Sequence, residues 1–231
     1  MFFNKRVFCA VFLMLFTMSV YVNAEETWKI TSLNWEPYSG DTLTSQGNSV
    51  QKFREVLRKK GIRLLVEFYP WLRAQKKAKT KEYVGYFPAW PEEVAKGFIA
   101  SPPVDWSEVA LMKNSDLDIT FKNIDDLVKK YKVGIVKTYV YPQEITDALK
   151  KYPKHADGSP NELSLLKKLA KGRIKVAVTD PNVMLYLAAK EGVDNIEMIK
   201  VVMKKELVVA FRDDDENKQR INLLKQLLKD N

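Results

Sequence analysis

Cysteine and histidine are almost missing from this sequence. Its 231 residues include one cysteine, Cys9, and one histidine, His155. A chain with so little of either has no disulfide framework, no cysteine-based metal site and no cluster of histidine ligands. It also has no phosphate-binding glycine loop. We therefore expect a protein without a cofactor, a metal ion or catalytic residues, that is, a protein that is not an enzyme.

No run of apolar residues is long enough to span a bilayer. The most apolar segment, residues 7–18, is shorter than the roughly 20 residues that a transmembrane helix needs. It follows a short basic region and precedes Val22 and Ala24, small residues that fit positions −3 and −1 of a cleavage site. This order predicts a cleavable secretory signal peptide over residues 1–24 and a mature protein in the periplasm. A retained membrane anchor is the alternative.

The chain carries a surplus of basic residues, with a net charge of +9. Two of these charges, Lys5 and Arg6, lie in the predicted signal and leave with it. Because an exported protein does not meet the genome, we exclude nucleic acid as a partner. Lysines on polar helix faces, a pattern that is usually solvated, supply much of the remaining surplus. These are Lys52, Lys59, Lys60, Lys76, Lys77, Lys79 and Lys81.

Strand-like and helix-like segments alternate along the mature chain. In the first half, the patterns predict strands at 28–35, 62–68 and 83–87, helices at 49–61 and 71–79, and mostly loop at 88–106. In the second half, they predict strands at 107–112, 132–136, 174–179, 196–201 and 206–211, and helices at 124–130, 143–151, 161–171, 181–190 and 214–229. This alternation indicates an α/β fold, and its occurrence in two sets indicates two lobes.

Five short segments, taken in order and with their spacing, carry a resemblance to a known family. They are Asn34-Trp35-Glu36-Pro37-Tyr38, Gly47 at the start of a helix, Val66-Glu67-Phe68, Val133-Gly134-Ile135-Val136-Lys137, and Gly172-Arg173-Ile174-Lys175-Val176-Ala177-Val178-Thr179-Asp180. Together they resemble the extracytoplasmic solute-binding proteins of the polar amino-acid ABC transporter type, solute-binding protein family 3. The resemblance covers the whole mature chain.

The resemblance implies a fold and a function. The fold is the type II periplasmic-binding-protein fold, a Venus flytrap of two α/β lobes with a hinge of two crossing strands. Residues 25–110 and 213–231 would form lobe 1, and residues 111–212 would form lobe 2. The implied function is capture of a small polar, amino-acid-like ligand between the lobes, by a monomer that delivers it to the membrane permease of an ABC transporter.

The same resemblance suggests residues that would contact the ligand. Trp35 and Tyr38 lie where the family places aromatic side chains beside the ligand, although core packing at a strand end explains them equally well. Lys137, Thr138 and Tyr139 fall at a loop-to-helix turn whose backbone amides would meet a ligand carboxylate.

Asp180 matches the acid that binds the ligand ammonium in the family. It also precedes Pro181, and a plain helix N-cap at that position needs no ligand. Both interpretations remain open at this stage.

The sequence departs from the family in lobe 1. Members commonly hold a ligand carboxylate with an arginine shortly after the third strand, whereas this chain has Trp90-Pro91-Glu92-Glu93-Val94 there. Glutamates would repel the same anion. Trp90 and, as a substitute cation, Arg73 are therefore further candidates for ligand contact. Arg73 could equally belong to a solvated helix face.

Two other functional classes remain open. The first is a periplasmic enzyme of the same fold, similar to dehydratases, that recruits Asp180 or Glu93 as an acid or base. The second is a sensory or interaction module that has no transport role and contacts a membrane protein through its basic surface.

Overall fold

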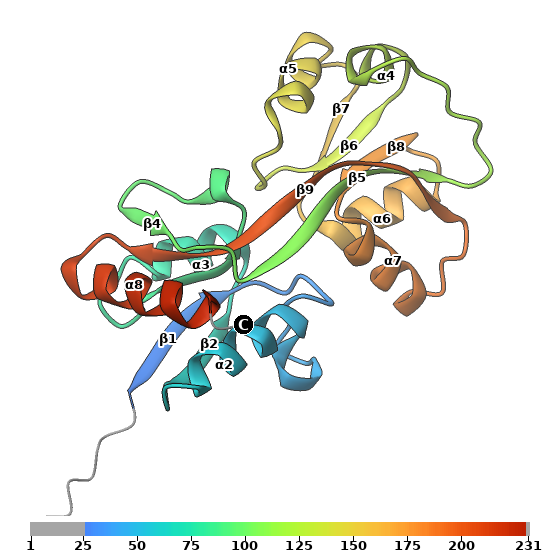
Figure 1. The fold of residues 1–231 in the computed structure, drawn as a ribbon. Helices are drawn as coiled ribbons and strands as arrows, with labels where there is room; N and C mark the ends of the chain where they lie inside the picture. The colour runs from blue at the N-terminus through green and yellow to red at the C-terminus, as the bar shows by residue number, and fades with distance from the viewer. Residues whose placement is uncertain (1–25, 230–231) are drawn as a thin grey trace, which may run out of the picture.

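Strands and helices alternate in the computed structural model, which describes residues 26–229 (Figure 1). The predicted signal peptide, residues 1–24, lies outside the described residues. The predicted α/β class and two-lobed arrangement are confirmed, with nine strands connected through one set of pairings. Within residues 26–229, no helix has both the length and the apolar character needed to cross a membrane.

Lobe 1 is built on a parallel core of three strands. The central strand β1 pairs with β2 on one side and with β3 on the other. Trp28 and Ile30 of β1 are completely buried, because helices cover both faces of a parallel sheet. The elements of this lobe are β1 (Thr27–Ser32), η1 (Thr44–Gln46), α2 (Asn48–Arg58), β2 (Arg63–Phe68), α3 (Trp71–Lys77), β3 (Gly85–Ala89), η2 (Pro91–Glu93), β4 (Phe98–Ala100) and α8 (Asp215–Lys229).

Lobe 2 places helices on both sides of a short parallel sheet. Figure 1 shows α4 and α5 on one side of the strands, and α6 and α7 on the other. All four residues of β8 are buried, as its apolar, β-branched composition predicted. The elements are α4 (Ile124–Lys130), β6 (Val133–Val136), α5 (Gln143–Lys151), β7 (Ala156–Ser159), α6 (Glu162–Ala170), β8 (Val176–Thr179) and α7 (Pro181–Lys190).

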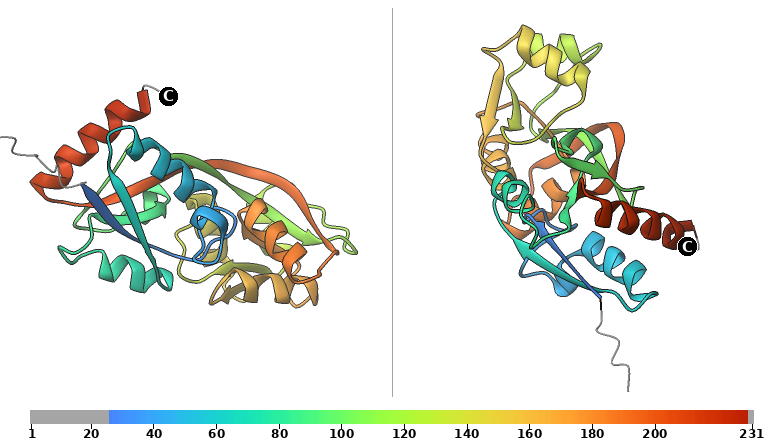
Figure 2. Two further views of the ribbon diagram at one scale, coloured as in Figure 1. Left: turned by 90° about the horizontal axis from the view of Figure 1, so that it is seen from below. Right: turned by 90° about the vertical axis from the view of Figure 1, so that its left-hand side faces the viewer.

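Two long antiparallel strands connect the lobes. β5 (Asp105–Asn114) pairs with β9 (Ile196–Arg212) along its whole length, and the views of Figure 2 show both strands running from one lobe into the other. The prediction of separate strands at 196–201 and 206–211 is wrong, because β9 is continuous. The middle section of β9 pairs with β5 through Met203, Lys204 and Lys205. The charges of the two lysines mask the hydrophobic pattern that predicts a strand.

Two short strands were missed in segments predicted as loop. β4 lies in the proline-rich segment 88–106 and pairs with β9. β7 follows His155 and consists of Ala-Asp-Gly-Ser, which has little intrinsic preference for a strand. Both are edge strands that form because a neighbouring strand, β9 for β4 and β6 for β7, supplies the hydrogen-bonding partners. His155 is half-buried and its Nδ1 lies 2.7 Å from the carbonyl oxygen of Val128.

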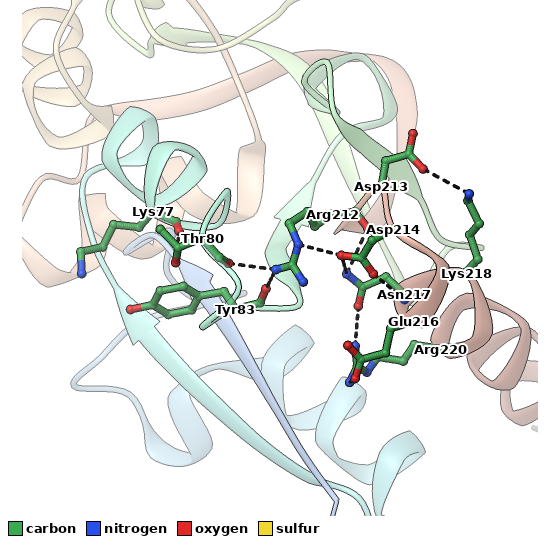
Figure 3. A network of polar contacts seen from close by, with 10 residues as sticks. All are labelled: Lys77, Thr80, Tyr83, Arg212, Asp213, Asp214, Glu216, Asn217, Lys218 and Arg220. Carbon is green, nitrogen blue, oxygen red and sulfur yellow. Dashed lines mark hydrogen bonds and ion pairs between the residues drawn. The ribbon is translucent and has the colours of Figure 1, made fainter.

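A polar network fixes the point at which β9 ends and α8 begins (Figure 3). The Arg212 guanidinium donates to the carbonyl oxygens of Thr80 (2.8 Å) and Tyr83, and its Nε lies 2.7 Å from Asp214 Oδ2. Asp214 in turn accepts a hydrogen bond from the amide of Asn217 (2.9 Å) and so caps the start of α8. This network attaches the C-terminal helix to the segment that leads into β3.

We expect Arg212→Ala to lower the free energy of unfolding by about 1–3 kcal/mol, because the carbonyl oxygens of Thr80 and Tyr83 and the Asp214 carboxylate lose a charged donor. Arg58→Ala, on the exposed last turn of α2, is the matched control and should change it by less than about 0.5 kcal/mol. Urea unfolding followed by circular dichroism measures both variants. Equal effects of the two substitutions would show that the network does not hold α8 in place.

Candidate functional site

A cavity lies between the two lobes, next to the strands that connect them. It is narrow, with about 20 Å³ of space for the centres of water-sized molecules, and residues from lobe 1, lobe 2 and β9 line it. They are Leu33, Trp35, Trp71, Pro88, Trp90, Glu93, Tyr139 and Leu207. A wider cleft, open to solvent and with about 330 Å³ of such space, shares Leu33, Trp71 and Tyr139 with this cavity. The other residues that line it include Thr138, Asn161 and Glu162 of lobe 2. We call the two spaces together the interlobe cleft.

Aromatic rings from both lobes form the wall of the interlobe cleft. Trp35 stacks on Tyr38 with ring centroids 4.6 Å apart, and the edge of Trp35 meets Trp90 at 6.2 Å. Trp90 also contacts Tyr139 of lobe 2, at 6.1 Å and an interplanar angle of 72°. The Trp90 indole donates to Ser107 Oγ (2.9 Å), which fixes its orientation. The wall is therefore preformed.

Asp180 is the N-cap of α7, as the sequence allowed. Its Oδ1 accepts from the amides of Asn182 (2.8 Å) and Val183 (3.1 Å), and its Oδ2 accepts from the amide of Glu108 (2.9 Å). The hydroxyl of Tyr38 in lobe 1 also donates to Oδ2, at 3.0 Å. Burial is the main cause that raises the pKa of Asp180. Since four hydrogen bonds use both oxygens, the carboxylate has little capacity left for a ligand ammonium.

The predicted amide turn is occupied by the protein itself. The amide of Lys137 donates to the carbonyl oxygen of Ser159 (2.9 Å), and that of Tyr139 donates to Val136 (3.2 Å). The next amide, that of Val140, lies near the carboxyl group of Glu93 from lobe 1 and lowers its pKa. The Lys137 side chain is exposed and lies outside the residues that line the cleft.

The backbone amides at the start of α2 are also bonded to the protein itself. The amides of Asn48 and Ser49 donate to the carbonyl oxygens of Pro37 and Tyr38, each at 3.0 Å. This contact needs glycine at position 47, because φ there is +102° and a Cβ atom would lie 2.6 Å from the Tyr38 carbonyl oxygen. The helix start therefore holds the Trp35–Ser39 loop rather than an anion.

Arg73 does not enter the interlobe cleft. Its side chain is exposed, and its guanidinium carbon lies 5.4 Å from the ring centroid of Tyr69. Lys205 is buried on β9, where it pairs with Glu92 and lies 5.6 Å from the Trp90 ring centroid. Among the described residues that line the interlobe cleft, none is lysine, arginine or histidine.

Glu93 brings a carboxyl group into the cavity from lobe 1. Its Oε1 accepts from the Trp71 indole (3.1 Å), and its Oε2 accepts from the amide of Trp90 (3.2 Å). The Val140 amide of lobe 2 also lies near this carboxyl group. Burial raises the pKa of Glu93 to about 7, because desolvation outweighs these hydrogen bonds and the charge of Glu92 adds to it.

Glu162 brings a second carboxyl group, from the first turn of α6. It is only 6% exposed, and its Oε2 accepts from the Thr179 hydroxyl (2.7 Å). Burial raises the pKa of Glu162 to about 8, and the negative charge of Asp180 contributes in the same direction. The Trp35 indole N–H lies near this carboxyl group and lowers the pKa slightly, but it forms no hydrogen bond with it.

Unpartnered polar atoms gather at the same place. Among the described residues, four buried side-chain polar atoms have no hydrogen-bond partner, and two of them are Trp35 Nε1 and Glu162 Oε1. A third, Ser159 Oγ, ends β7 beside the residues Pro160–Glu162 that line the cleft. Native proteins leave very few buried polar atoms without a partner, so this gathering indicates a place where a partner is missing.

The structure brings together part of the predicted set. Trp35, Trp90, Thr138 and Tyr139 line the interlobe cleft. Tyr38 and Asp180 lie behind its wall and bond to each other, and Arg73 and Lys137 lie outside it. Their roles as ligand contacts stay predictions.

Sequence reasoning missed Trp71 and Glu162 and did not count Glu93 among the ligand contacts. A glutamate in the first turn of a helix is ordinary, so the sequence carries no signal for Glu162. The unusual Trp-Pro-Glu-Glu run did mark Glu93. No group of three or more potential metal ligands occurs among residues 26–229.

No protein-family model and no curated protein matches this sequence. Solved structures do match its fold. A histidine kinase sensor domain with similarity to periplasmic binding proteins is 16% identical, with a TM-score of 0.74 over 89% of this chain and 90% of the other. An ancestral arginine-binding protein bound to arginine is 16% identical, with a TM-score of 0.71 over 88% of this chain and 93% of the other.

A third similar structure is an ancestral amino acid-binding protein that is a precursor of cyclohexadienyl dehydratase. It is 19% identical, with a TM-score of 0.66 over 88% of this chain and 90% of the other. The resemblance seen in the sequence is thus confirmed at the level of the fold: this chain has the two-lobed fold of the periplasmic binding proteins, and amino-acid-binding proteins are among the structures similar to it.

Proposed function

We propose that this chain is a binding protein whose two lobes close around a small polar ligand. The observation that carries the proposal is the pair of unpartnered atoms in the interlobe cleft, Trp35 Nε1 of lobe 1 and Glu162 Oε1 of lobe 2. Each buried polar atom without a partner costs about 1–3 kcal/mol. A ligand that supplies the missing hydrogen bonds recovers this free energy only when both lobes surround it.

The strands β5 and β9 are the proposed hinge. Only contacts between the lobes change when a hinge of this kind opens, and side-chain contacts across the lobes hold the closed form. Tyr38 donates to Asp180 and accepts from Asn182 (2.9 Å), and Glu36 pairs with Lys190 at 2.9 Å. We place the lobe boundaries as predicted, with residues 25–110 and 213–231 on one side and residues 111–212 on the other. A ligand shifts the equilibrium toward closure by its extra affinity for the closed form.

The proposed role is delivery of an amino-acid-like solute to the membrane permease of an ABC transporter, by a monomer in the periplasm. The predicted signal peptide supports the location, and the similarity to amino-acid-binding structures supports a small polar ligand. A sensory role would use the same closure, and the similar histidine kinase sensor domain supports it as a variant of the proposal.

One observation favours a second candidate function, a proton-transfer enzyme of the dehydratase type. Glu93 and Glu162 have pKa values raised to about 7 and about 8, close to the value that suits a general acid at neutral pH. The fold is also similar to a precursor of cyclohexadienyl dehydratase. Incubation with each bound compound, followed by NMR, distinguishes the two: a binding protein leaves the compound unchanged, whereas an enzyme consumes it.

The proposed binding function predicts stabilisation by a ligand. At a concentration of 100 times Kd, a ligand adds about 2.7 kcal/mol to the free energy of unfolding. For a chain of this size, that corresponds to a rise in Tm of roughly 5–10 °C. A thermal-shift screen of the mature chain against amino acids, amines and small carboxylates measures it. A folded protein that none of these compounds stabilises would contradict the proposal.

Glu162→Gln is expected to stabilise the ligand-free protein above neutral pH. The unfolded chain releases the Glu162 proton near the ordinary pKa of 4.5, whereas the folded protein holds it until about pH 8. The stability of the wild type therefore falls as the pH rises through this window. Glutamine does not ionise, so the variant avoids this loss, which corresponds to about 1.4 kcal/mol for each pKa unit.

Urea unfolding at about pH 5, 7 and 9 tests this expectation. The difference in the free energy of unfolding between Glu162→Gln and the wild type should grow with pH and level off above about pH 8. A difference that is constant across this range would mean that Glu162 is not a buried, unpaired acid.

A further inference from the structure

The donors that could receive a ligand carboxylate are already bound to a carboxyl group of the protein. The amide of Val140, in the turn after β6 of lobe 2, lies near the Glu93 carboxyl group and lowers its pKa. Glu93 accepts from the Trp71 indole and the Trp90 amide. In this chain, the carboxyl group of Glu93 therefore occupies the hydrogen-bond donors that a carboxylate ligand would need.

No basic side chain lines the interlobe cleft. Its lining residues include no lysine, arginine or histidine, within the described part of the chain. Arg73 and Lys77 do not line it but lie over the ring of Tyr69, which does, and Lys205 is paired with Glu92. An anion that entered would face Glu93 and Glu162 at short range, where the low dielectric strengthens repulsion.

The same lining suits a cation. Three tryptophans and one tyrosine line the cavity, and aromatic faces attract an ammonium group. Glu162 Oε1 offers an unused acceptor, and a hydrogen bond from an ammonium group to an ionised carboxylate is one of the strong ones. An ionised oxygen also has a second lone pair for the nearby Trp35 N–H. One cation thus explains both unpartnered atoms.

We infer that the interlobe cleft selects a small protonated amine that has no carboxylate group, with its ammonium on Glu162 and its carbon chain against Trp71 and Tyr139, which line the wider part of the cleft with Glu162. The inference rests on the proposed binding function and names the class of ligand for it. Glu93 takes the place of the carboxylate that an amino acid would bring.

Matched pairs of compounds that differ by one carboxylate test the inference. Isothermal titration of the mature chain compares putrescine with ornithine, agmatine with arginine, and histamine with histidine. We expect at least one amine to bind, and its amino acid to bind at least 10-fold more weakly. An amino acid that binds as tightly as its amine would overturn the inference while leaving the binding function intact. Failure of every compound in the thermal-shift screen would overturn both.

Variants locate the binding in the cleft. Glu162→Gln should weaken amine binding at least 10-fold, because the ammonium loses its charged acceptor. Glu144→Gln is the matched control, since Glu144 occupies the first turn of α5 but is exposed, and it should bind like the wild type. Thermal unfolding confirms that both variants are folded. Unchanged amine affinity in a folded Glu162→Gln variant would also overturn the inference.

Discussion

The antiparallel pairing of β5 with β9 is the constraint on which the rest of the structure depends. Every pairing between the strands of lobe 1 and those of lobe 2 passes through these two strands. Their length places the end of β1, the end of β3 and the turn after β6 around one cavity. Side chains that are far apart in sequence, such as Tyr38 and Asp180, can then bond across the lobes.

The packed lobes bury acids that lack a compensating cation. Glu162 is buried without a full set of hydrogen bonds, and Glu93 accepts from two neutral donors, the Trp71 indole and the Trp90 amide. A buried acid of this kind destabilises a protein, so its presence suggests a functional role. Both the proposed binding function and the dehydratase alternative use these acids, the first through a bound cation and the second through proton transfer. The aromatic wall favours the first, because it provides contact area and cation attraction without a reacting group.

The fold was predictable wherever local chemistry decides the structure. The sequence shows Asp180 as a helix cap before Pro181, the apolar run of β8 and the acidic residues at the start of α8. β7 and the middle of β9 were not predictable, because their composition is polar and partners elsewhere in the chain make them strands. Strand formation of this kind depends on tertiary context rather than on propensity.

The candidate site was also predictable only where a local sequence signal marks the residue. Trp35, Trp90 and Tyr139 were found from motif positions, and they do line the cleft. Asp180 was also found, but its carboxylate is already used by four donors, one of which comes from Tyr38 at a separation of 142 residues. Glu162 was missed because only the packed structure distinguishes a buried first-turn glutamate from a solvated one.

The most direct test of the account is a crystal structure of the protein saturated with the amine that binds most tightly in the titrations. The account predicts an ammonium nitrogen within hydrogen-bond distance of Glu162 Oε1, with the ligand chain against Trp71 and Tyr139. It also predicts that Glu93 keeps its hydrogen bonds to the Trp71 indole and the Trp90 amide. A ligand bound elsewhere, or a direct hydrogen bond between Trp35 and Glu162 with the cavity filled by side chains, would contradict it.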